Sequence, residues 1–216
     1  MRNSFIGVLI IPLLLIGVSF GQAKEITSQD YYDAYATVIH TVLEQPRRRT
    51  QATAYSTNGL VTKTVEEIEE VQNKDIRRFI YTEKVGLLRT QDETIEIEGA
   101  YYCRSNGGAW RRPKTDCSVM GARVVAGDSD GEEHFSTEQV TLNSIPLTVL
   151  RQFVVYKLSD KTAPNAKRVW ENRVWIDRSY RIVRREYKAG IPEGTYTSLV
   201  ETYDYDPKLK ITPPIK

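Results

Sequence analysis

Apolar and polar residues alternate most regularly near the C-terminal end of the chain. Aromatic and β-branched residues gather there in three runs: Lys167–Asp177, Arg181–Lys188 and Thr195–Asp206. Such residues favour a pleated, half-buried sheet. The breaks between the runs are short and rich in Gly, Pro, Asp and Ser, so they allow antiparallel hairpins but not parallel crossovers. The pattern therefore predicts an antiparallel meander of three strands.

Most of the preceding chain also reads as strands. The expected strands are Gln51–Thr57, Leu60–Asn73, Ile76–Val85, Thr90–Glu98, Phe135–Leu142, Pro146–Leu158, and a hairpin of Gly99–Arg104 with Gly108–Arg112. Asn58-Gly59 is the dipeptide most typical of a two-residue hairpin turn. The Glu-rich stretch Val65–Glu70 has too few apolar residues for a helical stripe, so it is assigned to a strand. Residues 113–133 have no regular pattern and are expected to form a loop.

One stretch near the N-terminus has the period of an amphipathic helix. Ser28 is a candidate N-cap, Asp30 follows in the first turn, and Pro46 lies just beyond the expected end near Glu44. Apolar and aromatic residues recur at helical spacing between these limits, namely Tyr32, Tyr35, Ala36, Ile39, Val42 and Leu43. The sequence therefore predicts one helix of about four turns.

The first residues have the features of a secretory signal peptide. Arg2 precedes an apolar run from Phe5 to Val18, and Gly21-Gln22-Ala23 has small residues where a signal peptidase needs them. Cleavage after Ala23 would leave residues 24–216 as a single domain, periplasmic or secreted. No Cys lies near the cleavage point, so lipid attachment is not expected there. Cleavage removes one of the 30 basic residues and none of the 28 acidic ones, and this balance argues against nucleic-acid binding.

The two cysteines, Cys103 and Cys117, favour a disulfide in an exported chain. The alternatives are a metal or redox pair. A metal site needs further Cys or His ligands, and the chain has only His40 and His134. A redox pair usually has two intervening residues.

Several C-terminal segments resemble the LolA/LolB-like superfamily. They are Val174-Trp175-Ile176-Asp177, the run from Arg181 to Glu186, the run from Glu201 to Asp206, and Ile211 with Pro213-Pro214. Members of the superfamily are periplasmic lipoprotein carriers and related lipid-handling proteins. The resemblance implies a mainly β fold, an incomplete antiparallel β-barrel with helices over its concave face. It also implies a lipid or lipoprotein acyl chain as partner, with a membrane-associated donor or acceptor protein as a further one, and no cofactor.

An open barrel leaves apolar side chains inside it that a ligand can cover, and acyl chains need no directional partners there. We therefore expect a carrier or chaperone with an apolar cavity. Alternation along a strand shows which of its residues share a face, but not which face points into the cavity. The candidates for the cavity lining are Phe79, Tyr81, Ile95, Ile97, Tyr101, Trp110, Val154, Tyr156, Trp170 and Tyr203. The alternative is a sensor or interaction module of the same fold, which would bind a protein partner and deliver no lipid.

The sequence carries no enzyme signature. It has no nucleophile elbow, zinc-binding helix motif or phosphate loop, and His40 and His134 have no evident catalytic partner. The stretch Asp128–Glu132 resembles the start of a calcium loop but lacks a Glu at the twelfth position. The expectation is a binding protein without catalytic residues or a metal.

Overall fold

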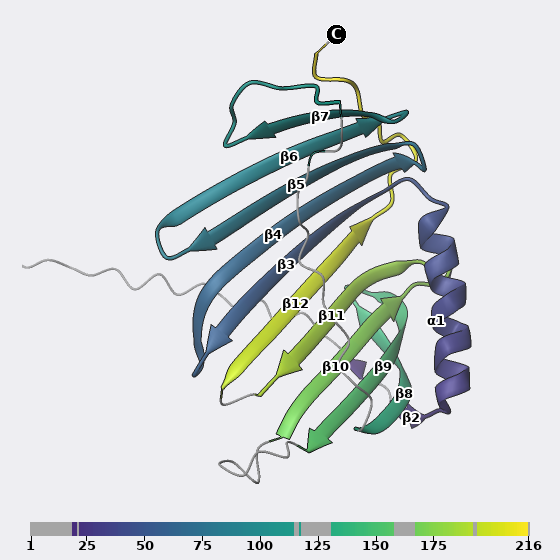
Figure 1. The fold of residues 1–216 in the computed structure, drawn as a ribbon. Coiled ribbons are helices and arrows are strands. Elements are labelled where there is room, and N and C mark those ends of the chain that lie inside the picture. The colour runs from purple at the N-terminus through teal and green to yellow at the C-terminus, as the bar shows by residue number, and fades with distance from the viewer. Residues whose placement is uncertain are drawn as a thin grey trace, which may run out of the picture.

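A single antiparallel sheet contains all the strands of the computed structural model (Figure 1), which describes residues 19–20, 22–114, 117, 131–157, 167–191 and 194–215. The strands are β1 (Ser19–Phe20), β2 (Lys24–Glu25), β3 (Arg47–Thr57), β4 (Leu60–Asn73), β5 (Ile76–Val85), β6 (Leu88–Ile97), β7 (Ala100–Ser105), β8 (Glu132–Leu142), β9 (Ile145–Lys157), β10 (Lys167–Ile176), β11 (Ile182–Gly190) and β12 (Thr195–Asp204).

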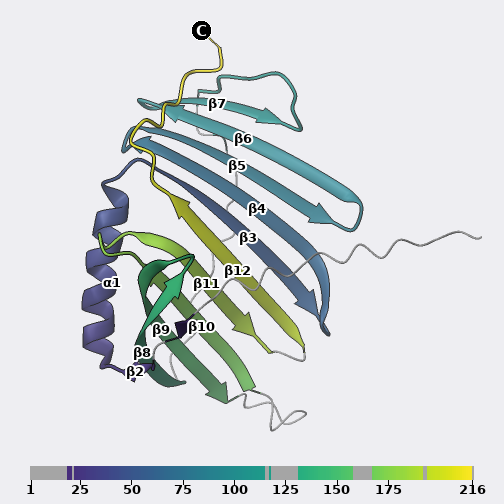
Figure 2. The same cartoon turned by 180° about the vertical axis from the view of Figure 1, so that it is seen from behind.

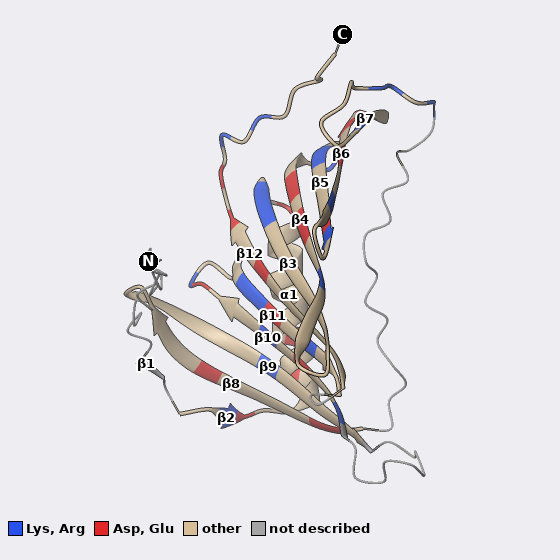
Figure 3. Cartoon of the chain, turned by 90° about the vertical axis from the view of Figure 1, so that its left-hand side faces the viewer, with Lys and Arg blue, Asp and Glu red and all other residues tan. Residues whose placement is uncertain are grey.

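The sheet is not closed into a barrel. Its strand order is β1-β8-β9-β10-β11-β12-β3-β4-β5-β6-β7, with β2 also paired to β8. Successive strands are neighbours from β3 to β7 and again from β8 to β12. The last strand, β12, pairs with β3, so the C-terminal meander joins the two halves of the sheet. The sheet is strongly twisted, and β8 and β9 run across the direction of β4 to β6 (Figure 3). The expected open antiparallel sheet is confirmed.

The alternating pattern located the strands well. The expected meander corresponds to β10, β11 and β12, and the Glu-rich stretch Val65–Glu70 lies inside β4. Asn58 and Gly59 have φ values of 50° and 76° and join Thr57 to its cross-strand partner Leu60. This is the tight turn that Asn-Gly predicts, because both central residues must adopt positive φ.

The helix α1 (Ser28–Leu43) ends as expected, with Glu44 as its C-cap, but its N-cap is Thr27 and the prediction of Ser28 was wrong. Thr27 Oγ1 accepts a hydrogen bond from the Asp30 amide at 3.1 Å, and the Asp30 carboxylate accepts one from the Thr27 amide at 3.4 Å. Both neighbouring residues carry a hydroxyl. Thr27 is the N-cap because Asp30 lies three residues after it, the spacing at which the two residues can form the reciprocal hydrogen bonds of a capping box.

The helix packs on one face of β8 to β11, which we call the helix-bearing face (Figure 1). The buried cluster between them comprises Tyr31, Val38, Val42, Phe135, Leu150, Val174, Ile176 and Ile182. Val174 is 0% exposed and Tyr31 is 1% exposed, so side chains fill the space directly beneath α1. In the described part of the chain this is the one helix.

The C-terminal segment covers part of the opposite face. After β12 the chain runs past the ends of the strands between β12 and β7 (Figures 1 and 2). Ile211 is buried against Ile95 and Tyr102, and its amide donates a hydrogen bond to Gln72 Oε1 at 2.8 Å. A second cluster on the opposite face, formed by Val140, Leu147 and Val149, lies toward the β1 edge.

The expected hairpin after Gly99 is only half formed. β7 is a strand, but Gly108–Arg112 is not. Arg111 alone exchanges two backbone hydrogen bonds with Cys103, each 2.9 Å long. Pro113 has no amide hydrogen to continue the ladder, which limits the pairing to this one bridge.

Some expectations lie outside the described residues. They concern most of the signal peptide, most of the loop 113–133 with its calcium-like stretch, and residues 158–166. Ser19 and Phe20 lie within the predicted signal peptide, and here they pair with Thr141 and Val140 of β8.

Candidate functional site

Side chains on the helix-bearing face form three parallel bands that cross the strands. Along β10, Val174 packs beneath α1, Asn172 lies two residues further along, and Trp170 two residues beyond that. The same order is found along β12, with Tyr203, Glu201 and Leu199. Two residues of a strand span roughly 7 Å, so the three bands lie close together.

The middle band is a network of hydrogen bonds and ion pairs that we call the polar belt: Tyr31, Asn172, Arg185, Glu201, Arg49, Glu67 and Glu69. It starts at the helix, where the Tyr31 hydroxyl accepts a hydrogen bond from Asn172 Nδ2 at 3.0 Å. Arg185 Nε donates to Asn172 Oδ1 at 2.8 Å and a second Arg185 nitrogen lies 3.8 Å from Glu201. Burial raises the pKa of Tyr31 to about 12, although the hydrogen bond from Asn172 opposes this. The belt therefore continues from α1 across β10, β11 and β12.

Arg49 is the centre of the other half of the belt. Its guanidinium lies 2.9 Å from Glu201, 3.2 Å from Glu69 and 3.7 Å from Glu67. Figure 3 shows the alternation of charge on the neighbouring strands β12, β3 and β4. Burial acts to lower the pKa of Arg49, but the charges of Glu69 and Glu201 outweigh it and raise that pKa. The side chains of Glu67 and Glu201 are only 6% and 4% exposed, so these are ion pairs largely removed from water.

The third band, which we call the apolar row, consists of Val154, Trp170, Tyr187, Leu199 and Val65. Val154 is opposite Trp170, Tyr187 is opposite Leu199, and Thr53 lies between Leu199 and Val65. Between β10 and β11 the row steps diagonally, because the residue directly opposite Tyr187 is Asn172 of the polar belt. The rings of Trp170 and Tyr187 meet edge to face with centroids 5.7 Å apart. Trp170 is partly exposed and the others are buried. None of them belongs to the cluster packed against α1.

The predicted cavity residues fall in several places. Seven have the parity of the helix-bearing face: Phe79, Tyr81, Tyr101, Val154, Tyr156, Trp170 and Tyr203. Ile95 and Ile97 point to the opposite face, where Trp110 packs with them around Ile211. The ten residues therefore do not share one surface, and their role in ligand binding stays a prediction.

Only two of the seven belong to the apolar row, namely Val154 and Trp170. Tyr203 borders the polar belt, where its hydroxyl donates a hydrogen bond to Glu201 at 3.0 Å. Burial and the nearby charge of Glu201 raise the pKa of Tyr203. The ring of Tyr156 lies against Gly131, where a β-carbon would approach it to 2.9 Å.

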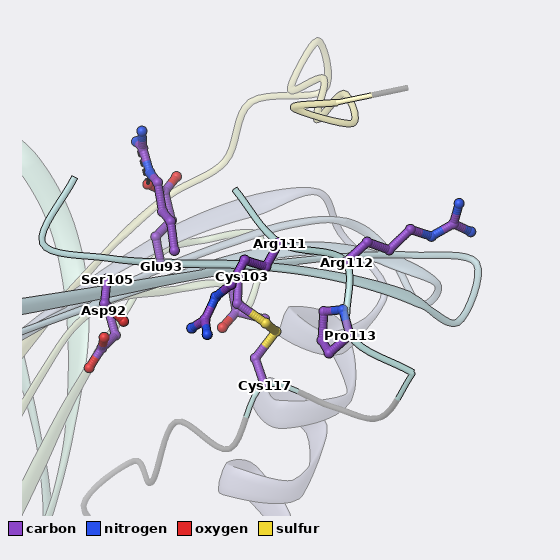
Figure 4. A pocket seen from close by; sticks show the side chains of 10 residues that line it. Asp92, Glu93, Cys103, Ser105, Arg111, Arg112, Pro113 and Cys117 are labelled. Carbon is purple, nitrogen blue, oxygen red and sulfur yellow. Dashed lines mark hydrogen bonds and ion pairs between the residues drawn. A yellow bond between two sulfur atoms is a disulfide. The ribbon is translucent and has the colours of Figure 1, made fainter. Parts of the chain in front are cut away.

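Two pockets lie near the β7 edge of the sheet. One, of about 430 Å³, surrounds the disulfide between Cys103 and Cys117, and Arg111, Arg112 and Pro113 also line it (Figure 4). The other, of about 340 Å³, contains Phe79 and Tyr101 together with Arg77, Glu69 and Glu96. The disulfide is confirmed. Both pockets are lined with charged side chains, which suit a polar ligand better than an acyl chain.

The structure places the two histidines on separate elements. His40 and His134 are largely exposed, on α1 and β8, and each lies near one carboxylate, that of Glu44 at 3.6 Å and that of Glu132 at 3.4 Å. Among the described residues no three His, Cys, Asp or Glu side chains are grouped as metal ligands. Within the same residues, no helix combines the length and apolar character needed to cross a membrane.

No family model matches the chain, and no curated protein matches it. Three solved structures show a distant likeness. LprF from Mycobacterium bovis is 9% identical, with 89% of this chain and 100% of that chain covered and a TM-score of 0.49. A domain assigned to outer membrane lipoprotein sorting, from Vibrio parahaemolyticus, is 9% identical, with coverages of 85% and 95% and a TM-score of 0.33. A DUF1329 family protein from Desulfovibrio piger is 12% identical, with coverages of 84% and 94% and a TM-score of 0.33.

At these identities and TM-scores the likeness says nothing about what the chain binds. The architecture itself is informative, because an unclosed antiparallel sheet with a helix packed on one face is what the resemblance in the sequence implied. That expected architecture is therefore confirmed.

Proposed function

We propose that the chain is an exported binding protein that holds the acyl chain of a lipid or lipoprotein along the apolar row. The observation that carries this proposal is the row itself, which runs from β9 to β4, with Thr53 as its one polar position on β3. It lies on the same face as the helix and is separate from the helix core. Such a line of aliphatic and aromatic side chains suits an extended hydrocarbon. Each buried methylene contributes roughly 0.8 kcal/mol without a directional partner.

The polar belt gives this site a second property. It lies one band away from the apolar row, and its two cations, Arg49 and Arg185, remain partly exposed there, with 21% and 30% of their side chains accessible. A head group that meets the belt while its chain follows the row would satisfy both surfaces. The ligand of this proposal is therefore amphiphilic, with a polar end toward α1 and a hydrocarbon end away from it.

Trp170 and Trp175 provide a matched test, because both lie on β10 but face opposite sides of the sheet. We expect Trp170→Ala to weaken the binding of a long-chain fatty acid by roughly tenfold, which corresponds to about 1.4 kcal/mol of lost apolar contact. Trp175→Ala removes a ring that packs near Val183 and under Arg184 on the other face, and should leave the affinity unchanged. Isothermal titration of both variants measures the difference.

Circular dichroism of both variants would establish that they keep the sheet. Equal affinity of the two folded variants, or a loss confined to Trp175→Ala, would place the ligand elsewhere and contradict the proposal.

A further inference from the structure

Two neighbouring hairpin turns carry large apolar side chains that are exposed to solvent. These side chains, which we call the tip patch, are Leu60, Val61, Val85, Leu87 and Leu88. Leu87 is 105% exposed, Leu88 76% and Leu60 73%. Turn positions normally carry Gly, Asn, Asp, Ser or Pro. Three leucines and two valines at adjacent turns are therefore not explained by turn chemistry.

The geometry of the two turns keeps these side chains outward. Thr57 pairs with Leu60 across the β3–β4 turn, and Val85 pairs with Leu88 across the β5–β6 turn. A β-carbon built on Gly59 or Gly86 would meet nothing within 4 Å, so no other part of the described chain packs against either turn at that point. Strands β4 and β5 are neighbours, and both turns lie at the end of the sheet remote from α1 (Figures 1 and 2).

The two turn stretches themselves carry only positive charge. The stretches 57–64 and 84–91 contain no Asp or Glu, but they contain Lys63, Lys84 and Arg89. Lys63 is paired with Glu83 at 2.7 Å. Lys84 and Arg89 lie opposite each other on β5 and β6, are exposed, and make no ion pair with any residue of the described chain. Two cations thus flank the exposed leucines without a neutralising partner.

We propose that the tip patch docks the protein on the surface of an anionic lipid bilayer. Apolar side chains at the tips of rigid hairpins can enter the boundary between head groups and acyl chains, while Lys84 and Arg89 stay among the phosphates. The charge favours this occupant over a neutral apolar partner, because a bilayer supplies both a hydrocarbon layer and a dense negative surface. Docking does not require the acyl ligand of the apolar row, and so either proposal can fail without the other.

Sedimentation with lipid vesicles tests this proposal. The purified protein should sediment with vesicles that contain phosphatidylglycerol and much less with pure phosphatidylcholine. Leu87→Asp combined with Leu88→Asp should weaken sedimentation at least about tenfold. Lys84→Glu combined with Arg89→Glu should weaken it on the anionic vesicles and reduce its dependence on salt.

Two control variants lie away from the tip patch. Leu43→Asp changes a leucine at the end of α1 that is 66% exposed, and Lys74→Glu changes an exposed lysine at the opposite end of β4. Both should sediment like the unmodified protein.

Three results would overturn the proposal. The first is no sedimentation with anionic vesicles, and the second is an equal loss of sedimentation in the tip and control variants. The third is self-association without lipid that the leucine substitutions abolish, because the tip patch would then bind a second copy of the chain. Fatty-acid affinity measured on the same tip variants should be unchanged, which separates a failure of docking from a failure of the acyl site.

Discussion

Arg49→Met should destabilise the folded chain by about 3–5 kcal/mol, because it leaves Glu67 and Glu201 buried without their shared cation. The guanidinium lies within 3.7 Å of three carboxylates, and Met fills a similar volume without the charge. Urea unfolding followed by circular dichroism measures the change in the free energy of unfolding. Adding Glu201→Gln to Arg49→Met should recover part of the loss, since it removes one of the buried negative charges that Arg49 faced.

Arg48 offers the matched control for this prediction. It is the preceding residue, it faces the opposite side of β3, and its side chain is 50% exposed beside Glu70 at 3.8 Å. Exposed ion pairs contribute about 0–1 kcal/mol, so Arg48→Met should be nearly neutral. If the two Arg→Met variants unfold at the same urea concentration, the polar belt does not stabilise the protein in the way described.

Removal of the disulfide by Cys103→Ser and Cys117→Ser should have the second largest effect on stability. The disulfide joins residues that are 14 positions apart in the sequence. A loop of that size restricts the unfolded chain by about 3 kcal/mol in the chain-entropy account. For a chain of this length the corresponding fall in Tm is roughly 6–12 °C. A thermal melt of the double variant against the oxidised protein measures it.

A reductant supplies the internal control. It should lower the Tm of the unmodified protein to that of the double variant and leave the double variant unchanged. A double variant that melts with the oxidised protein would mean that the loop does not restrain unfolding.

The strands could be predicted from the sequence because alternation is a local property. Asn58-Gly59, the runs that became β10 to β12, and the Glu-rich part of β4 each carried their own signal. The N-cap could be placed only to within one residue, since Thr27 and Ser28 both carry a hydroxyl. The local sequence was therefore sufficient to predict the strands but did not distinguish between two candidates for the N-cap of the helix.

The three bands could not be predicted, because they depend on register between strands that are distant in the sequence. Parity within β6 left open whether Ile95 points inward, and only its pairing with β7 and contact with Ile211 settle this. Glu67 and Glu69 share a strand face with Val65. Two glutamates on the same strand face as an apolar residue could have indicated the polar belt. Arg49 and Glu201 come close to them, however, only because β3 pairs with both β4 and β12.

The central claim, that an acyl chain lies along the apolar row, is tested most directly by a brominated fatty acid and tryptophan fluorescence. Two variants each retain one tryptophan of β10: Trp110→Phe with Trp175→Phe leaves Trp170, and Trp110→Phe with Trp170→Phe leaves Trp175. Bromine quenches only on contact, so the bound ligand should quench Trp170 strongly and leave Trp175 bright. Equal quenching of both, or quenching of Trp175 alone, would contradict the account.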